Sequence, residues 1–196
     1  MSDMTPTRSE GAREAGIVAA VQTAADLLSI LGSYLAVACT VGLTLLVLAE
    51  ILAATLARVI PSVPASIHVG WEYSGYLMGA SFLLGAGMTL RAGLQIRVEM
   101  LMRAGKERFA RQFEAVSSLI GAGVTVFLAI SMVNLTLRTW RFGEVSQDSL
   151  TPLWIPQAVL ALGAIILALQ MVARVFTCLA GRSVDDPTLG AASAIE

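Results

Sequence analysis

The stretch LLSILGSYLAVACTVGLTLLVLA, Leu27–Ala49, decides the fold class, because it holds 23 consecutive residues without a charged side chain. A helix rises about 1.5 Å per residue and the hydrocarbon core of a bilayer is about 30 Å thick, so this stretch is long enough to cross a membrane. It is longer than the apolar core of a signal peptide, and Glu50 and Arg58 follow it in place of a cleavage site. The stretch therefore predicts a membrane helix that is retained.

Three further charge-free blocks follow: Tyr73–Leu90 with 18 residues, Ala115–Leu137 with 23 and Ser149–Ala173 with 25. The whole chain is 56% hydrophobic, with a mean hydropathy of +0.76, which is far above an ordinary soluble domain. The blocks lack the alternation of membrane strands. We predict an all-α integral membrane protein with four transmembrane helices, at about residues 27–57, 71–92, 115–138 and 150–175.

The basic residues predict the orientation of these helices. Ten Lys and Arg residues fall in the two tails and in the connector after the second helix, against three on the other side, Arg58, Arg138 and Arg141. By the positive-inside rule, both termini and the connector are cytoplasmic. The net charge of −1 hides this segregation, and no nucleic-acid partner is predicted.

The predicted domains are a cytoplasmic tail (1–26), a four-helix membrane domain (27–175) and a second cytoplasmic tail (176–196). Ile17–Asp26 is a weak candidate for a short helix on the membrane surface. The connector Arg91–Glu114 places apolar residues on one helical side and charges on the other, so it predicts an amphipathic element at the cytoplasmic interface. Contact with lipids and docking of a partner both remain open for it.

Small residues in the second predicted helix indicate close helix packing. Gly75 and Gly79 have GxxxG spacing, and Gly85 lies further along the same helix. Glycines let helix backbones approach each other in membranes. Whether the neighbouring helix belongs to this chain or to another remains open.

The sequence offers little chemistry inside the membrane. His68 lies in a predicted outer loop, which excludes bis-histidine haem ligation, and Cys39 and Cys178 form no CxxC pair. We predict no catalytic site, no metal and no cofactor. The intramembrane polar residues are too few for a self-sufficient transporter: Glu50, Asn134, Gln157 and Gln170. For Glu50, a structural or interfacial role is favoured and an ion-coupling role remains open.

Two stretches resemble the small permease (Q-type) subunit of tripartite ATP-independent periplasmic (TRAP) transporters. The first, WEYSGYLMGASFLLGAGMTLRAGLQIRVE (residues 71–99), matches the family pattern at Glu72, Gly85, Arg91, Gly93, Ile96, Val98 and Glu99. It departs from that pattern at Trp71, Gly75 and Gln95. The second, SLTPLWIPQAVLALGAIILALQ (residues 149–170), matches at Ser149, Pro152, Trp154, Pro156, Gly163, Leu169 and Gln170. The resemblance covers about residues 27–175.

This resemblance implies a complex of three parts in the bacterial inner membrane: a periplasmic solute-binding receptor, a large permease that carries the substrate and Na⁺ sites, and this small subunit as a scaffold. It implies uptake of organic acids driven by an ion gradient, and no enzymatic activity. Glu72, Arg91 and Glu99 are the predicted polar contacts. Two alternatives remain: a self-sufficient small transporter or channel, and an anchor subunit of a membrane enzyme.

The prolines of the second stretch have a structural interpretation. The first four N–H groups of a helix have no partner within it, so a proline there removes almost no hydrogen bond. We expect the last helix to begin near Pro152, with Ser149 or Thr151 as its cap, and only Pro156 to delete one backbone bond. Trp154 is expected at the outer interface, and Gln157 is expected to bond a loose backbone group or a neighbouring helix.

Overall fold

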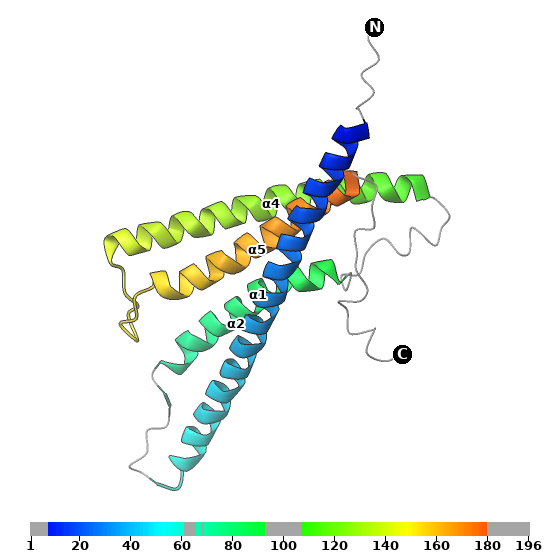
Figure 1. The fold of residues 1–196 in the computed structure, drawn as a ribbon. Coiled ribbons are helices and arrows are strands. Elements are labelled where there is room, and N and C mark those ends of the chain that lie inside the picture. Colours follow the sequence, from blue (N-terminus) through cyan, green and yellow to red (C-terminus); the bar gives the residue numbers. More distant parts are fainter. Residues whose placement is uncertain (1–7, 61–65, 68, 93–106, 180–196) are drawn as a thin grey trace, which may run out of the picture.

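The computed structural model describes residues 8–60, 66–67, 69–92 and 107–179, and the side chains of 19–60, 66–67, 69–92 and 115–178. These residues form four helices: α1 (Arg8–Leu56), α2 (Gly70–Arg91), α4 (Glu107–Phe142) and α5 (Trp154–Leu179) (Figure 1). Within the described ranges there is no strand beyond one isolated antiparallel bridge, between Val145 and Pro152. The predicted all-helical class is therefore confirmed.

Three of these helices contain a segment long and apolar enough to cross a membrane: Ala19–Leu56, Ala115–Phe142 and Trp154–Cys178. The 22 residues of α2 suffice in length, but the glycines, serines and tyrosines of this helix keep it outside that set. A fourth span and the orientation with both termini in the cytoplasm therefore stay predictions.

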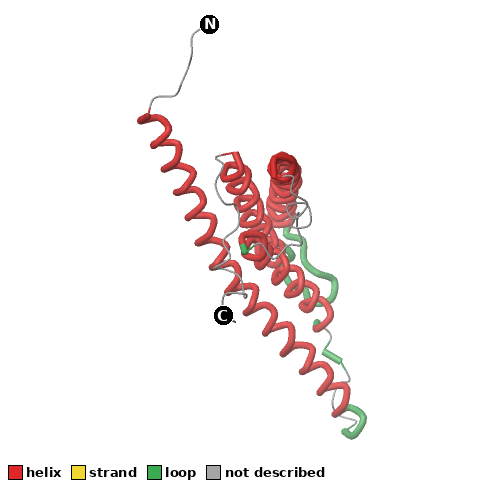
Figure 2. Tube along the Cα trace, turned by 90° about the vertical axis from the view of Figure 1, so that its right-hand side faces the viewer, coloured by secondary structure: helices red, strands yellow, loops and turns green. Residues whose placement is uncertain are grey.

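The α5 helix lies at the centre of the arrangement, because it contacts α1, α2 and α4. The helices α2, α4 and α5 run alongside one another, and α1 crosses them obliquely (Figures 1 and 2). Small side chains make the contacts of α5 close: Ala161, Ala164, Ala168 and Ala173 are all buried. Because these alanine side chains are small, the backbones of the neighbouring helices can lie close to α5.

The α1 helix begins at Arg8, well before the start expected near Leu27. Ile17–Asp26 is therefore a continuous part of α1 and not a separate surface helix. The added residues are mostly good helix formers such as Ala, Glu, Arg and Gln. The length of a charge-free stretch predicts which part of a helix can lie in hydrocarbon, but it does not predict where the helix begins. With 49 residues, α1 is about 73 Å long, so tilt or extension beyond the bilayer must accommodate it.

Most of the predicted amphipathic connector, with Gly93, Gln95 and Glu99, lies outside the described residues. His68, in the loop before α2, is also outside them. Its last part, from Glu107 onwards, belongs to α4.

The start of α5 differs from the expected geometry. The helix begins at Trp154, so Pro152 precedes it and Pro156 falls among the first residues, whose N–H groups have no helical partner. Neither proline deletes a helical hydrogen bond, and the expectation that Pro156 deletes one was wrong. Ser149 and Thr151 do not cap the helix, because the Ser149 hydroxyl bonds the Thr151 hydroxyl at 2.7 Å and the Thr151 N–H at 3.2 Å.

Two glycines allow α1 and α5 to approach the same point of α2. A Cβ atom on Gly32 would lie 2.8 Å from the carbonyl oxygen of Leu84, and one on Gly163 would lie 2.8 Å from Leu83 Cβ. Of the predicted GxxxG pair, Gly79 faces Leu160 of α5 with a Cβ distance of 3.1 Å. A Cβ atom on Gly75 would meet nothing within 4 Å, so Gly75 makes no close helix contact within the described ranges.

Candidate functional site: two polar clusters at opposite ends of the helices

An ion pair joins α1 and α2 near the cytoplasmic ends of the two predicted membrane segments. Arg91 Nε of α2 donates to both oxygens of the Asp26 carboxylate of α1, at 3.1 Å to Oδ1 and 3.3 Å to Oδ2. The side chains are only 14% exposed for Arg91 and 21% exposed for Asp26. Arg91 is the cation that the sequence singled out, and Asp26 is a partner that the sequence did not identify.

Two side-chain amides complete the environment of this carboxylate. Gln170 of α5 donates to Asp26 Oδ1 at 2.9 Å, and Gln22, one turn before Asp26 on α1, donates to the same oxygen at 2.7 Å. The Thr177 hydroxyl of α5 then donates to the Gln22 carbonyl at 3.1 Å. These five side chains, the Asp26 cluster, connect three helices through one carboxylate.

A second guanidinium lies beside the Asp26 cluster. Arg174 of α5 is 6% exposed, and its Nη1 donates to the backbone carbonyl of Leu90 at the end of α2, at 3.4 Å. From the sequence, Arg174 was interpreted only as one of the basic residues that determine orientation. Burial of a charge in a membrane protein is costly unless it is paired, and here each charge has a partner on another helix. The cluster is therefore suited to holding α1, α2 and α5 in a fixed register.

The second cluster lies at the opposite end of α2, around Glu72. Tyr76 donates its hydroxyl to Glu72 Oε1 at 2.5 Å, and Tyr76 stacks edge-on against Tyr73 with ring centroids 6.1 Å apart. The other carboxylate oxygen, Oε2, is buried, and Ser146 and Ser149 of the α4–α5 loop lie beside this carboxylate.

The loop between α4 and α5 covers this end of α2. Backbone bonds from Ser146 N to Thr151 O (2.9 Å) and from Leu153 N to Glu144 O (3.1 Å) close the loop as a short hairpin. The Thr151 hydroxyl meets the Tyr73 hydroxyl at 2.7 Å. Ser149, one of the predicted residues, bonds Thr151 and lies beside Glu72, and its predicted role stays a prediction. We call Trp71, Glu72, Tyr73 and Tyr76 with Ser146, Asp148, Ser149 and Thr151 the Glu72 cluster.

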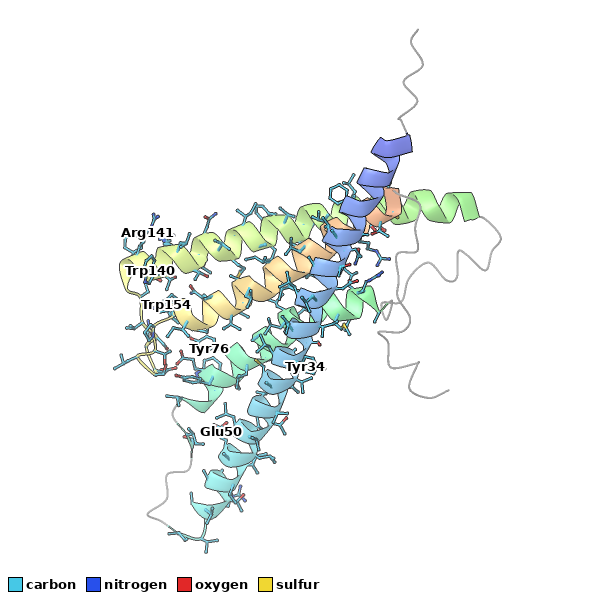
Figure 3. All side chains as sticks on the ribbon, in the orientation of Figure 1. Tyr34, Glu50, Tyr76, Trp140, Arg141 and Trp154 are labelled. Carbon is cyan, nitrogen blue, oxygen red and sulfur yellow. The ribbon has the colours of Figure 1, made fainter. Side chains whose placement is uncertain are left out.

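A further side-chain bond fastens the hairpin to the first turn of α2: Trp71 Nε1 donates to Asp148 Oδ2 at 3.2 Å. Aromatic and cationic side chains gather around the same end, where Figure 3 shows Trp140, Arg141, Trp154 and Tyr76 together. This composition is typical of a membrane–water interface. Trp154, predicted there, is 38% exposed.

The side chain of Glu50, a residue of α1, lies beside Gly70, the first residue of α2. A Cβ atom on Gly70 would lie 3.2 to 3.3 Å from the carboxylate atoms of Glu50. The N-terminus of a helix carries a partial positive charge, which stabilises a nearby carboxylate. This contact favours the structural role over ion coupling.

The remaining predicted residues are dispersed. Glu72 and Arg91 lie at opposite ends of α2, about 30 Å apart at 1.5 Å per residue, so they belong to separate clusters. Gln157 has a buried side-chain oxygen without a hydrogen bond among the described residues, so the expected bond is not observed. Gly85 packs near Ala36 of α1. Asn134 is exposed on α4.

Neither cluster has the composition of a metal site. Among the described residues there is no group of three or more His, Cys, Asp or Glu side chains that could hold a metal ion. The sequence could have found Asp26 and Gln22, because their spacing of four residues places both on one helix face with Ser29. They were missed because they precede the charge-free block.

The comparison with known protein families agrees with this arrangement of membrane helices. The model of the family "Tripartite ATP-independent periplasmic transporters, DctQ component" matches residues 43–181, which run from α1 to just beyond α5. No curated protein and no solved structure matches the chain significantly. The family is a transporter component and not an enzyme family. The matched segment covers well over half of the chain, so this protein belongs to the DctQ family, the small permease component of TRAP transporters.

Proposed function

We propose that this chain is the scaffold subunit of a TRAP-type secondary transporter in the bacterial inner membrane. A large permease subunit carries the substrate and the coupling ion, and a periplasmic receptor delivers an organic acid to it. The small subunit holds the static part of the permease and enlarges its footprint in the bilayer. The Asp26 cluster is the observation that carries this proposal.

The Asp26 cluster supports a scaffold role because its polar side chains form hydrogen bonds with one another. One carboxylate receives hydrogen bonds from Arg91, Gln22 and Gln170, which belong to three helices. A cation site needs several converging oxygens that are free to bind the ion, and an anion site needs donors aimed into a cavity. A saturated network favours rigidity over ligand binding.

The Glu72 cluster supports the same role at the predicted periplasmic end. The hairpin between α4 and α5 is tied to α2 through Tyr73–Thr151 and Trp71–Asp148. A fixed loop on this side offers a stable surface towards the receptor. In this proposal α2 is the fourth membrane span, and the Arg-rich connector lies in the cytoplasm.

The experiment separates the scaffold from a self-sufficient transporter. The full chain, purified alone in detergent, is titrated with organic acids in Na⁺ buffer by calorimetry, and the chain co-expressed with its large permease is reconstituted into liposomes with the loaded receptor. We expect no saturable binding by the isolated chain and Na⁺-dependent uptake by the complex.

Saturable binding to the isolated chain that is lost in Glu50→Gln would contradict the scaffold proposal and favour a self-sufficient transporter. Glu72→Gln serves as a matched control, because it neutralises a carboxylate at a similar depth without touching Gly70. Copurification of a redox protein in place of a permease would favour the anchor subunit of an enzyme.

A further inference from the structure

One face of α4 has no partner among the residues that the structure describes. Its residues recur at alternating spacings of four and three, which places them in one line along the helix. We call this line the α4 stripe: Val116, Ile120, Gly123, Phe127, Ile130, Asn134 and Leu137. All of them are exposed, with exposed fractions of 72% for Phe127 and 63% for Ile120. The opposite face, with Ala122 and Ala129, is buried.

Asn134 makes the α4 stripe unsuitable for contact with lipid alone. Its side chain is exposed, and it makes no hydrogen bond in the described part of the chain. It lies six residues before Trp140, about 9 Å deeper along the helix than this interfacial aromatic residue. Hydrocarbon tails offer no hydrogen bonds, so an amide at this depth requires a polar partner.

Gly123 gives the α4 stripe a second feature of a helix contact. A Cβ atom there would meet nothing within 4 Å, so this glycine packs against no other helix in the described part of the chain. A glycine in the middle of a helix is less favourable than alanine by about 1 kcal/mol, and in membranes it allows another helix to approach closely. Gly123 and Asn134 are eleven residues apart, about three turns, and therefore lie on the same face.

Among the described residues, the exposed surface of α1 has no glycine that faces open space and no exposed side-chain amide. Its hydroxyls at Thr40, Thr44 and Thr55 each donate to the backbone carbonyl four residues earlier, at 2.8 to 2.9 Å. Large aliphatic side chains such as Leu45 (61% exposed) and Leu48 (56% exposed) form most of the rest, together with the aromatic ring of Tyr34 (72% exposed). This surface suits lipid.

We propose that the α4 stripe docks a transmembrane helix of the large permease subunit, with a small residue opposite Gly123 and a hydrogen-bonding side chain opposite Asn134. The proposal rests on the proposed function. A second copy of this chain fits less well, since the stripe continues to Arg141, which is exposed. Two copies with the same orientation in the membrane would bring these two arginines together, and like charges repel.

The test uses the full chain co-expressed with the large permease of its own transporter. Asn134→Leu and Gly123→Leu each remove one feature of the stripe. Thr44→Val and Ala38→Leu are the matched controls on the exposed surface of α1. We expect the two stripe variants to recover about threefold to tenfold less large subunit in copurification, which corresponds to one lost interhelical contact. The controls should match wild type.

Two further measurements identify the occupant. The isolated chain should melt in detergent at a temperature no lower than wild type with either stripe variant, because neither residue packs against another helix among the described residues and leucine is the better helix former. A photo-crosslinking amino acid at position 127 should give an adduct with the large subunit, and one at position 45 should not.

Wild-type recovery of the large subunit by both stripe variants would overturn the proposal. Adducts from position 127 to a second copy, or only to lipid, would overturn it as well. If the wild-type chain recovered no large subunit, the proposed function itself would fail; a recovered permease that the stripe variants leave bound refutes the docking surface alone.

Discussion

Asp26 of α1 and Arg91 of α2 form an ion pair across two helices, with Arg91 Nε 3.1 Å from Asp26 Oδ1. The residues are 65 positions apart in the sequence. Gln170 of α5 donates to the same carboxylate oxygen, so the pair has a third helix as a neighbour. This single carboxylate therefore links the three helices α1, α2 and α5.

Removing one member of this pair leaves the other buried without its partner. We expect Asp26→Ala to lower the free energy of unfolding by about 3 kcal/mol, because the Arg91 guanidinium keeps its desolvation cost and loses the carboxylate that balances its charge. Denaturant titration of the chain in mixed micelles measures this change. Thr23→Ala is the control, since the Thr23 hydroxyl bonds only its own helix, at Ala19 O.

The double variant Asp26→Leu with Arg91→Met removes both charges. We expect it to recover much of the stability, because an apolar pair of similar volume replaces a buried ion pair with little loss. A double variant as unstable as Asp26→Ala would mean that the hydrogen bonds of the cluster matter and that the charge balance does not.

Two glycines of the membrane helices differ in their surroundings: Gly163 lies in a close helix contact, and Gly75 does not. Substituting alanine at each position tests this difference. A Cβ on Gly163 would lie 2.8 Å from Leu83 Cβ and 3.0 Å from the Leu84 backbone nitrogen. We expect Gly163→Ala to destabilise the chain by about 2 kcal/mol, because α2 and α5 must separate. Gly75→Ala meets nothing within 4 Å and should stabilise the chain by up to about 1 kcal/mol. Thermal unfolding in detergent ranks the two variants, and equal melting temperatures would contradict the close contact.

The hairpin between α4 and α5 contains two residues in the left-handed backbone region. Gly143 has a φ of 63° and Leu150 has a φ of 56°, and the Leu150 side chain is 71% exposed. We expect Leu150→Gly to stabilise the chain by about 0.5 kcal/mol, because relief of strain exceeds the entropy loss of glycine. Gly143→Ala should destabilise it by about 1 kcal/mol. Chemical denaturation checks both signs. A loss of stability in Leu150→Gly would show that this leucine makes a contact that outweighs the strain.

The sequence predicted the parts of the fold that depend on local chain properties. Charge-free length identified the membrane-crossing segments of α1, α4 and α5, and the family pattern identified Arg91 and Gln170. It could not predict that Asp26 receives both of them, because the crossing of α1 over α2 and α5 has no local signature. The glycine pattern failed in a similar way: Gly75 and Gly79 have the expected spacing, but the closest contacts involve Gly32 and Gly163.

The last prediction concerns the orientation of the helices in the membrane. Bonds between Trp71 and Asp148 and between Tyr73 and Thr151 hold the start of α2 against the α4–α5 hairpin. We therefore expect the loops before α2 and after α4 to lie on one side of the membrane. Three basic residues on that side against ten on the other predict that it is the periplasmic side.

Single cysteines test this orientation in a chain with Cys39→Ala and Cys178→Ala. In intact cells an impermeant maleimide should label cysteines at Ser66 and Glu144, which are both exposed, and should not label one at Lys106. All three should react after the membrane is permeabilised, which controls for accessibility. Labelling at Lys106 alone would reverse the orientation and leave the Glu72 cluster facing the cytoplasm, where no periplasmic receptor could reach it. Labelling of only one of Ser66 and Glu144 would contradict the shared side that the hairpin contacts require.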